Sequence, residues 1–253
     1  MNPTTFELGK DFLYEYYEEG IRGVLNGLSE VAPHVGRYII EGFGHVFSNP
    51  TLSYQQRELI TLSVLTSLGD CPNQLNWHIH FGLKVGLTPE EIMEIFTHCI
   101  PFSGFPRSLN AVGVAKQVFT DLQLQVKVED ELLNVKGRRE RGLAKLIEID
   151  GEHGTEVIQS LANISPDLGN QIVDFTFGEI YSRSALDSKQ RQLVTLGSLT
   201  AQGGCEPQLQ VHVNAAMRVG LSKEEIVEAL LHCSLYTGFP KVLNAIRVAR
   251  EVL

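Results

Sequence analysis

Residues 57–118 read RELITLSVLTSLGDCPNQLNWHIHFGLKVGLTPEEIMEIFTHCIPFSGFPRSLNAVGVAKQV, and residues 191–252 read RQLVTLGSLTAQGGCEPQLQVHVNAAMRVGLSKEEIVEALLHCSLYTGFPKVLNAIRVAREV. The two stretches align without a gap at an offset of 134 residues (191 minus 57), and about 29 of the 62 paired positions are identical. Internal repetition in only two copies indicates a duplicated domain rather than a solenoid. We therefore expect two repeats, over residues 1–122 and 123–253, joined by a polar segment at residues 121–138.

Both repeats have apolar side chains at the spacing of amphipathic helices. In repeat 1 this spacing predicts helices over residues 5–28, 33–48, 53–68, 73–85, 88–102 and 105–119, and repeat 2 follows the same order. Capping-box pairs, which mark helix starts, occur at Ser53 with Gln56, Asp187 with Gln190, and Ser222 with Glu225. Gly69 and Gly86 follow predicted helices as C-terminal glycines do. We find no convincing strand, so the expected fold class is all-α.

The composition excludes several classes of protein. The net charge of −9 argues against nucleic acid or an anionic membrane as the main partner. No apolar run approaches the roughly 18 residues that span a bilayer, and the N-terminus lacks the features of a signal peptide. Four cysteines in 253 residues do not make a disulfide scaffold. We therefore expect a soluble cytoplasmic protein with reduced thiols.

Three residues of repeat 1 form the main candidate site. Cys71 lies just before the helix predicted over residues 73–85, where the helix dipole favours a thiolate and lowers its pKa. His78 lies seven residues on, about two turns, so it shares a face with Cys71. Glu58, on the preceding helix, can reach the same pocket. The equivalent positions of repeat 2 are Cys205, His212 and Gln192. Two interpretations stay open: an acid–base or thiol site, or side chains that only pack.

The candidates for binding a substrate are Arg57, His80, His98 and Arg107. Arg57 and its counterpart in repeat 2 suit either a salt bridge between helices or a clamp for a carboxylate. His80 and His78 are two residues apart and so lie on different helix faces, which is unlike zinc spacing, and we expect no metal site. Gln74 occupies the place of the second thiol of a Cys-x-x-Cys motif, so no local redox couple is expected.

Several motifs together resemble the carboxymuconolactone decarboxylase family. In repeat 2 they are Phe177-Gly178-Glu179-Ile180-Tyr181-Ser182-Arg183, the run RQLVTL from Arg191, Glu224-Glu225-Ile226 and Tyr236-Thr237-Gly238-Phe239-Pro240. In repeat 1 they are Arg57-Glu58-Leu59, His78, Glu90-Glu91-Ile92 and Gly104-Phe105-Pro106. The resemblance covers both repeats and nearly the whole chain.

This resemblance implies a tandem pair of helical domains of the alkyl-hydroperoxidase D type. Family members with one copy form hexameric rings, so a two-copy chain is expected to form a homotrimer with the same ring. The namesake enzyme converts 4-carboxymuconolactone to 3-oxoadipate enol-lactone and carbon dioxide without a cofactor. The hydroperoxidase relatives use Glu, Cys-x-x-Cys and His, and the matching positions here are Glu58, Cys71, Gln74 and His78.

Three hypotheses follow. The first is a cofactor-free decarboxylase of a small carboxylated lactone, in which His78 donates a proton, Glu58 tunes it and Arg57 or Arg107 holds a carboxylate. The second is a thiol-dependent peroxidase that uses Cys71, and the third is a helical assembly without catalysis. We expect any chemistry to belong mainly to repeat 1, because Gln192 cannot ionise as Glu58 can.

Overall fold

The computed structural model describes residues 3–127 and 135–253, and in these residues it contains helices and no strand. Repeat 1 consists of α1 (Thr5–Leu28), α2 (Pro33–Phe47), α3 (Tyr54–Leu68), α4 (Pro72–Lys84), α5 (Pro89–His98), α6 (Ile100–Ser103) and α7 (Phe105–Asp121). Repeat 2 consists of α8 (Arg138–Asp150), α9 (Glu152–Leu161), α10 (Pro166–Gln171), the π-helix η1 (Ile172–Ile180), α11 (Ser188–Gln202), α12 (Glu206–Arg218), α13 (Lys223–His232), α14 (Ser234–Thr237) and α15 (Phe239–Val252). The expected all-α fold is confirmed. Part of the joining segment, residues 128–134, lies outside the described residues.

The predicted helix ends follow local capping chemistry. All three expected capping boxes form, and Thr88 caps α5 in the same way. Gly69 ends α3 with a left-handed φ of 83°, which a glycine adopts without strain. The helix expected to run to residue 102 is instead two helices, because α5 ends at His98 and α6 begins at Ile100. Pro101 has no N–H to continue the first helix, although repeat 2 breaks at the same point without a proline.

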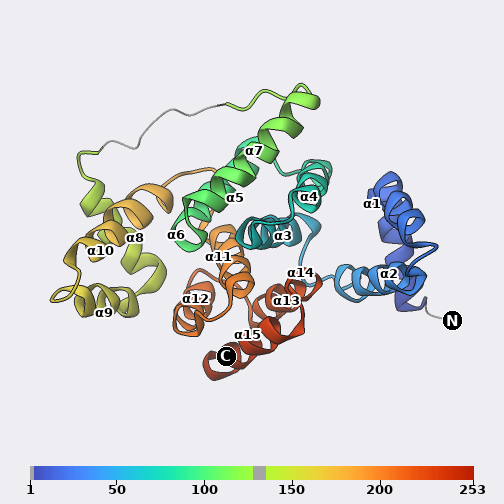
Figure 1. Cartoon of the computed structure of the whole chain (residues 1–253). Helices are drawn as coiled ribbons and strands as arrows, with labels where there is room; N and C mark the ends of the chain where they lie inside the picture. Colours follow the sequence, from blue (N-terminus) through green and yellow to red (C-terminus); the bar gives the residue numbers. More distant parts are fainter. Residues whose placement is uncertain (1–2, 128–134) are drawn as a thin grey trace.

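Helices α3 and α11 pack side by side at the centre of the molecule (Figure 1). Each is buried around its whole circumference, as expected for a central helix. Gly197 of α11 faces Ser63 of α3 so closely that a side chain at Gly197 would clash with the serine hydroxyl. These residues hold equivalent positions in the two repeats, so the helices cross at a pseudo-twofold axis. One hydrophobic core contains residues of both repeats, which therefore interlock.

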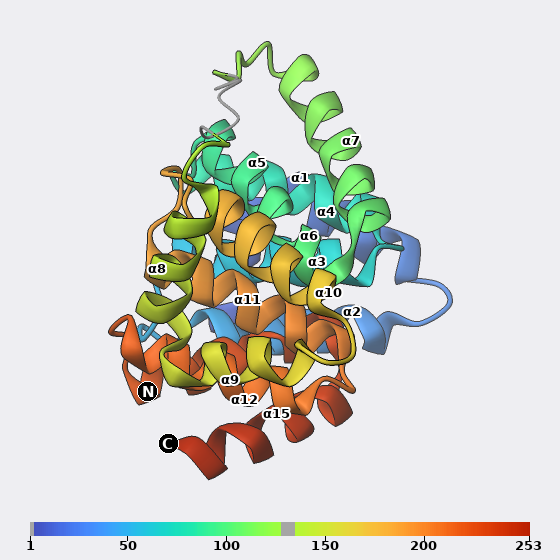
Figure 2. The ribbon, with the colours of Figure 1, turned by 90° about the vertical axis from the view of Figure 1, so that its left-hand side faces the viewer.

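The N-terminal helices of each repeat flank this centre, with α1 and α2 on one side and α8 to α10 on the other (Figures 1 and 2). Gly9 of α1 and Gly44 of α2 allow these helices to cross in backbone contact. Gly142 of α8 and Gly178 of η1 make the same contacts in repeat 2. Gly142 follows Gly9 by 133 residues (142 minus 9), whereas Gly178 follows Gly44 by 134 (178 minus 44). Gly169 of α10 still follows Gly36 of α2 by 133 residues (169 minus 36), so the additional residue falls between Gly169 and Gly178, a stretch that is mostly η1. A one-residue insertion is what produces a π-helical turn.

None of the helices that the structure describes is both long enough and apolar enough to cross a bilayer.

Candidate active site

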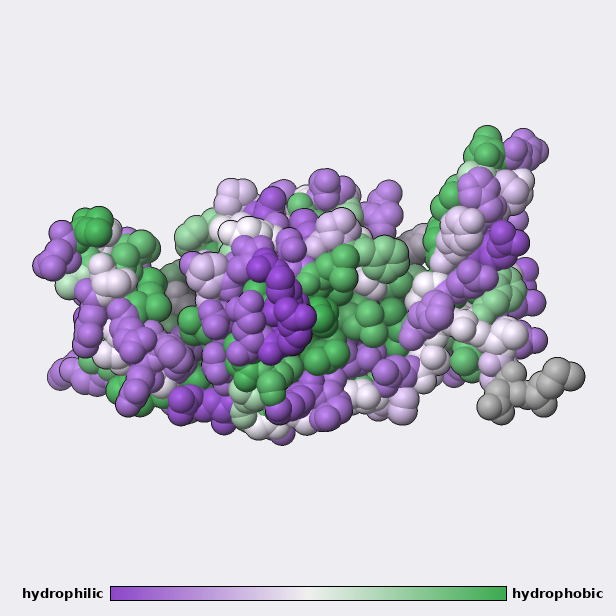
Figure 3. Space-filling model, turned by 90° about the horizontal axis from the view of Figure 1, so that it is seen from below, coloured by the Kyte–Doolittle hydropathy of each residue, from purple (hydrophilic) through white to green (hydrophobic). Residues whose placement is uncertain are grey.

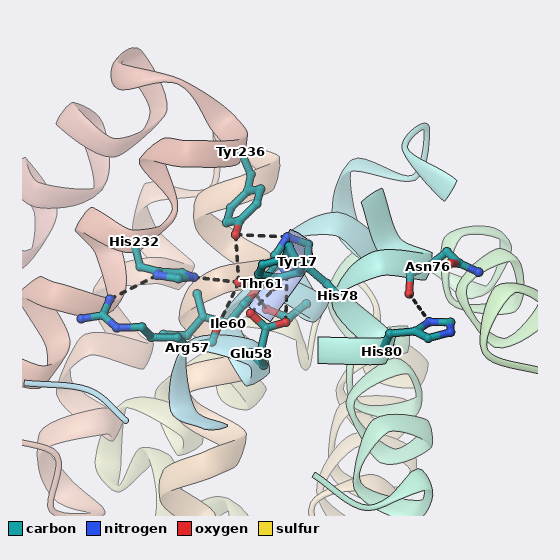
Figure 4. Close-up of polar contacts among 11 residues, drawn as sticks. Tyr17, Arg57, Glu58, Ile60, Thr61, Asn76, His78, His80, His232 and Tyr236 are labelled. Carbon is teal, nitrogen blue, oxygen red and sulfur yellow. Dashed lines mark hydrogen bonds and ion pairs between the residues drawn. The ribbon is translucent and has the colours of Figure 1, made fainter. Parts of the chain in front are cut away.

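The candidate site of repeat 1 is an acid–histidine pair between α3 and α4. Nδ1 of His78 lies 2.9 Å from Oε2 of Glu58 and 3.2 Å from its Oε1 (Figure 4). The carboxyl of Glu58 is fully buried and the histidine is 5% exposed. Burial raises the pKa of Glu58, and the charge and hydrogen bond of His78 partly offset this effect. Glu58 was expected to reach the same pocket from the preceding helix, and the structure places its carboxyl against His78.

Two tyrosine hydroxyls complete the surroundings of the His78 ring (Figure 4). The hydroxyl of Tyr17, from α1, lies 3.3 Å from Nδ1, and the hydroxyl of Tyr236, from α14 of repeat 2, lies 3.4 Å from Nε2. Burial raises the pKa of both phenols well above its usual value. Tyr17 also has non-helical backbone angles (φ −134°, ψ 24°) inside α1, so the helix kinks where it reaches the histidine. Sequence reasoning did not assign either tyrosine to the site.

Arg57 belongs, in a structural role, to the cluster of side chains around Glu58 and His78. Its guanidinium is fully buried and lies 2.8 Å from Oε1 of Glu228, with a second bond of 2.7 Å to the carbonyl of Asn49. It also lies 3.3 Å from Nδ1 of His232, whose Nε2 is 2.7 Å from the hydroxyl of Thr61. The guanidinium considered above as a carboxylate clamp is therefore committed to an ion pair between the repeats.

A second cluster repeats this arrangement on the other side of the pseudo-twofold axis. Arg191 lies 2.8 Å from Glu94 of α5 and 3.1 Å from Nδ1 of His98. Nε2 of His98 is 2.9 Å from the hydroxyl of Thr195. Burial, followed by the charge of Arg191, lowers the pKa of His98 well below its usual value. His98, one of the candidates for binding a substrate, thus belongs to the cluster of repeat 2, as His232 belongs to that of repeat 1.

Three of the positions that differ between the two clusters lie around His78 and His212. Gln192 stands for Glu58, Phe102 stands for Tyr236, and Asp150, the last residue of α8, stands for Tyr17. Nδ1 of His212 lies 3.2 Å from Oε1 of Gln192, and burial lowers the pKa of this histidine to about 4. The carboxyl of Asp150 was not predicted, because the repeat alignment began at Arg191 and α8 lies outside it.

The cysteines lie apart from these clusters. Cys71 caps α4 and lines a groove of about 780 Å³ with Arg107 and Trp77, and its thiol donates to the carbonyl of Leu65 at 3.5 Å. Burial, with a smaller contribution from the charge of Asp70, raises the pKa of the Cys71 thiol. This direction is opposite to the lowering expected from the helix dipole, since the loss of hydration outweighs it.

Cys205 repeats this pattern, with its thiol 3.2 Å from the Leu199 carbonyl and its pKa raised by burial. No hydrogen bond joins either thiol to a histidine in the part of the chain that the structure describes. The geometry therefore brings together Glu58 and His78 but leaves Cys71 outside.

His80 is the remaining candidate of the sequence analysis. It is exposed, its Nδ1 lies 3.1 Å from the carbonyl of Asn76, and its ring points away from Glu58 and His78 (Figure 4). In residues 3–127 and 135–253, no three His, Cys, Asp or Glu side chains cluster as a metal site requires.

Comparison with known proteins agrees with the duplicated architecture. A profile of the carboxymuconolactone decarboxylase family matches residues 33–117 and again 166–251. The 4-carboxymuconolactone decarboxylase of Acinetobacter baylyi is 37% identical over 121 residues, which cover 47% of this chain and 90% of the relative. The nitrosuccinic acid decarboxylase of Metarhizium robertsii is 32% identical over 104 residues, covering 40% of this chain and 72% of the relative.

A solved structure extends the likeness to the full chain. It comes from Burkholderia xenovorans LB400 and carries a provisional name as a gamma-carboxymuconolactone decarboxylase subunit. Its TM-score is 0.63 over 99% of this chain and 98% of the other, at 18% identity, so it supports the fold alone. Together with the two profile matches, this shows that the chain belongs to the carboxymuconolactone decarboxylase family and carries two copies of the family domain.

Proposed function

We propose that the protein is a cofactor-independent carboxy-lyase that acts on a small carboxylated lactone of the 4-carboxymuconolactone type. Two relatives are named as decarboxylases, and both named substrates are small dicarboxylates. In each of these substrates, the carbon that loses its carboxylate is attached to an electron-withdrawing group, either directly or through a conjugated double bond. The observation that carries the proposal is His78, a buried imidazole held between a carboxylate at 2.9 Å and a phenol at 3.4 Å.

The reaction requires charge stabilisation followed by one proton transfer. When the bond to the carboxylate carbon breaks, carbon dioxide leaves and the electron pair stays on the lactone as an extended enolate. Hydrogen-bond donors aimed at that developing charge lower the barrier, and the hydroxyls of Tyr17 and Tyr236 are suitable donors. A proton from the site then adds to the enolate, and water returns a proton to the site.

His78 is our candidate for the proton donor. Its Nδ1 faces the carboxyl of Glu58, which fixes the orientation of the ring. The proton for the substrate therefore leaves from Nε2, on the side of Tyr236. General acid catalysis of this kind contributes about 10²–10⁴-fold to a rate.

Arg107 is our candidate for binding the carboxylate that the substrate keeps. It lines the groove beside α4, the helix that carries His78. No ion pair engages its guanidinium in the part of the chain described by the structure. Replacement by methionine is expected to raise KM with little change in kcat, because this contact holds the substrate equally before and during the reaction.

The test measures release of carbon dioxide from 4-carboxymuconolactone and from nitrosuccinic acid, followed by steady-state kinetics of variants. Glu58→Gln is the sharpest variant, because it installs the residue that repeat 2 carries at the equivalent position. We expect kcat to fall about 10²-fold or more for Glu58→Gln and His78→Asn. The matched variant His212→Asn in repeat 2 is expected to keep most of the activity. Equal losses from His78→Asn and His212→Asn, in correctly assembled protein, would contradict the assignment to repeat 1.

We also propose a homotrimer that acts in the cytoplasm. Four free cysteines fit a reducing compartment. Helices α7 and α15 lie at opposite ends of the molecule in two views (Figures 1 and 2), and each carries two exposed apolar residues. The face seen from below, where α15 lies, has hydrophobic surface between hydrophilic areas (Figure 3). Such end-to-end surfaces suit a closed ring of three chains.

A further inference from the structure

Repeat 2 contains a cavity of about 220 Å³ next to His212. Its apolar wall includes the rings of Phe102 and Phe177, and its polar wall includes Asp150 and Tyr181. The lining comes from both repeats, since Phe102 belongs to α6. This volume is smaller than the roughly 300–1,000 Å³ of pockets for drug-sized ligands, so only a compact molecule fits.

The hydrogen bonds around His212 determine which ring nitrogen is free. The side-chain amide of Gln192 donates to the hydroxyl of Tyr181 at 3.5 Å, which leaves its oxygen to accept from Nδ1–H of His212 at 3.2 Å. Nε2 of His212 is then an unprotonated acceptor. In repeat 1 the equivalent nitrogen faces Tyr236, but Phe102 holds that position here and has no hydroxyl. Within the described residues, Nε2 of His212 has no hydrogen-bond partner.

Asp150 supplies a second polar group to the lining of the cavity. The side chain is 9% exposed, and its Oδ1 is buried without a hydrogen-bond partner. A buried polar atom left in this state destabilises the fold unless a ligand or water satisfies it. Burial raises the pKa of Asp150 to about 7, against smaller opposing effects of Arg218 and His153, so the carboxyl is largely protonated at pH 6.

The charge of the wall limits the chemistry of the ligand. At pH 6 the wall presents a neutral imidazole acceptor, a protonated carboxyl and the phenol of Tyr181. None of these groups is a cation that would compensate an anionic ligand. Phe102 packs edge-on to the His212 ring with centroids 5.4 Å apart, which leaves aromatic surface for a planar ligand.

We propose that this cavity is a second binding site, separate from the Glu58–His78 pair, for a small uncharged aromatic hydroxy compound of the phenol class. The hydroxyl of the ligand donates to Nε2 of His212 and accepts from the carboxyl of Asp150. The ring lies against Phe102 and Phe177. The one-residue insertion in η1 shapes this wall, because Thr176 and Phe177 of the π-helix line the cavity.

The test is fluorine NMR titration of the full-length protein at pH 6 with three probes of similar size: 4-fluorophenol, fluorobenzene and 4-fluorobenzoate. We expect 4-fluorophenol to bind at least about fivefold more tightly than fluorobenzene, the ratio that one net hydrogen bond provides. We expect 4-fluorobenzoate to bind more weakly than either. Equal affinity for 4-fluorophenol and fluorobenzene, or preferred binding of the benzoate, would overturn the proposal.

Variants locate the binding site. Val157→Phe fills the cavity from α9, where the native side chain is 41% exposed, and is expected to abolish binding of 4-fluorophenol. Asp150→Leu, which keeps the branching of the side chain but removes its polar atoms, is expected to remove the preference over fluorobenzene. Glu58→Gln is the matched control and is expected to leave binding unchanged while reducing decarboxylation. Binding of 4-fluorophenol that survives Val157→Phe would place it elsewhere and refute the site, whether or not the protein proves to be a decarboxylase.

Discussion

Tyr236 and Phe102 occupy the same position in the two repeats, and the two side chains differ by one hydroxyl group. In repeat 1 the phenol of Tyr236 lies 3.4 Å from Nε2 of His78, so both nitrogens of that histidine contact polar groups. In repeat 2 the phenyl ring of Phe102 leaves Nε2 of His212 without a partner. We therefore attribute proton transfer to His78 and ligand acceptance to His212.

Asp150 gives a prediction about stability and pH. Its pKa is about 7 in the folded protein and 3.8 in the reference state, so the folded protein binds more protons between these values. The contribution of Asp150 to the free energy of unfolding therefore decreases as pH rises from about 4 to 7. Above that range this contribution is constant. A shift of three pKa units changes the free energy of unfolding by at most about 4 kcal/mol.

The Asp150→Asn variant cannot titrate but keeps the shape of the side chain. Urea unfolding at fixed protein concentration should therefore show the variant gaining stability relative to the natural protein between pH 4 and pH 8. A difference between the two proteins that does not change with pH would show that Asp150 ionises normally in the fold.

At the scale of elements, the crossing of α1 and α2 determines whether Tyr17 reaches His78. Gly9 lies in contact with the backbone of α2, and an added Cβ would clash with the Ile40 carbonyl. We expect Gly9→Ala to destabilise the fold by about 1–3 kcal/mol, because the two helices must separate. The same displacement should lower kcat, since α1 carries Tyr17.

Gly23 provides the control for this prediction within the same helix. Nothing lies within 4 Å of a Cβ added there, so Gly23→Ala is expected to be neutral or to stabilise the helix by up to about 1 kcal/mol. Thermal or urea unfolding of both variants, together with their kinetics, tests the crossing. Equal stability of the two variants would show that the backbone contact is not tight.

The helices themselves were predictable because their signals are local. Capping boxes such as Ser53 with Gln56 and glycines such as Gly69 act within one turn of the chain. The contacts of Arg57 with Glu228 were not predictable, because they join residues 171 positions apart across the interlocked repeats. Glu58 and His78 met as predicted, since both belong to neighbouring helices of one repeat.

Asp150 was missed for a different reason. Its counterpart Tyr17 lies 133 residues earlier (150 minus 17), whereas the repeat alignment has an offset of 134. The one-residue insertion in η1 shifts the offset, so the equivalence becomes visible only when the helix crossings are compared. A π-helical insertion of this kind leaves no periodic signal in a single sequence.

At the scale of the whole molecule, the exposed apolar surface gives a prediction about assembly. Phe105 and Leu109 of α7 are 56% and 64% exposed, and Phe239 and Leu243 of α15 are 73% and 67% exposed. The four residues occupy equivalent positions in the two repeats, so each end of the molecule presents the same pattern. If α7 of one chain packs on α15 of the next, the contacts are head-to-tail, and three chains close the ring expected for six domains. Light scattering after size-exclusion chromatography should then give about 84 kDa, three times the 28.1 kDa of one chain.

A substitution in either α7 or α15 alone should be enough to open this ring. A glutamate at position 109 would be buried against apolar surface without a partner, so we expect Leu109→Glu to dissociate the assembly into chains of about 28 kDa. Leu243→Glu should have the same effect from the other end, because every contact in the ring uses one α7 and one α15. Tyr38→Glu is the control: Tyr38 is 58% exposed, but the equivalent position in repeat 2 is Gln171, so the apolar pattern is not repeated there. A natural protein that is monomeric at micromolar concentration, or a Leu109→Glu variant that keeps the mass of the natural protein, would rule out this ring.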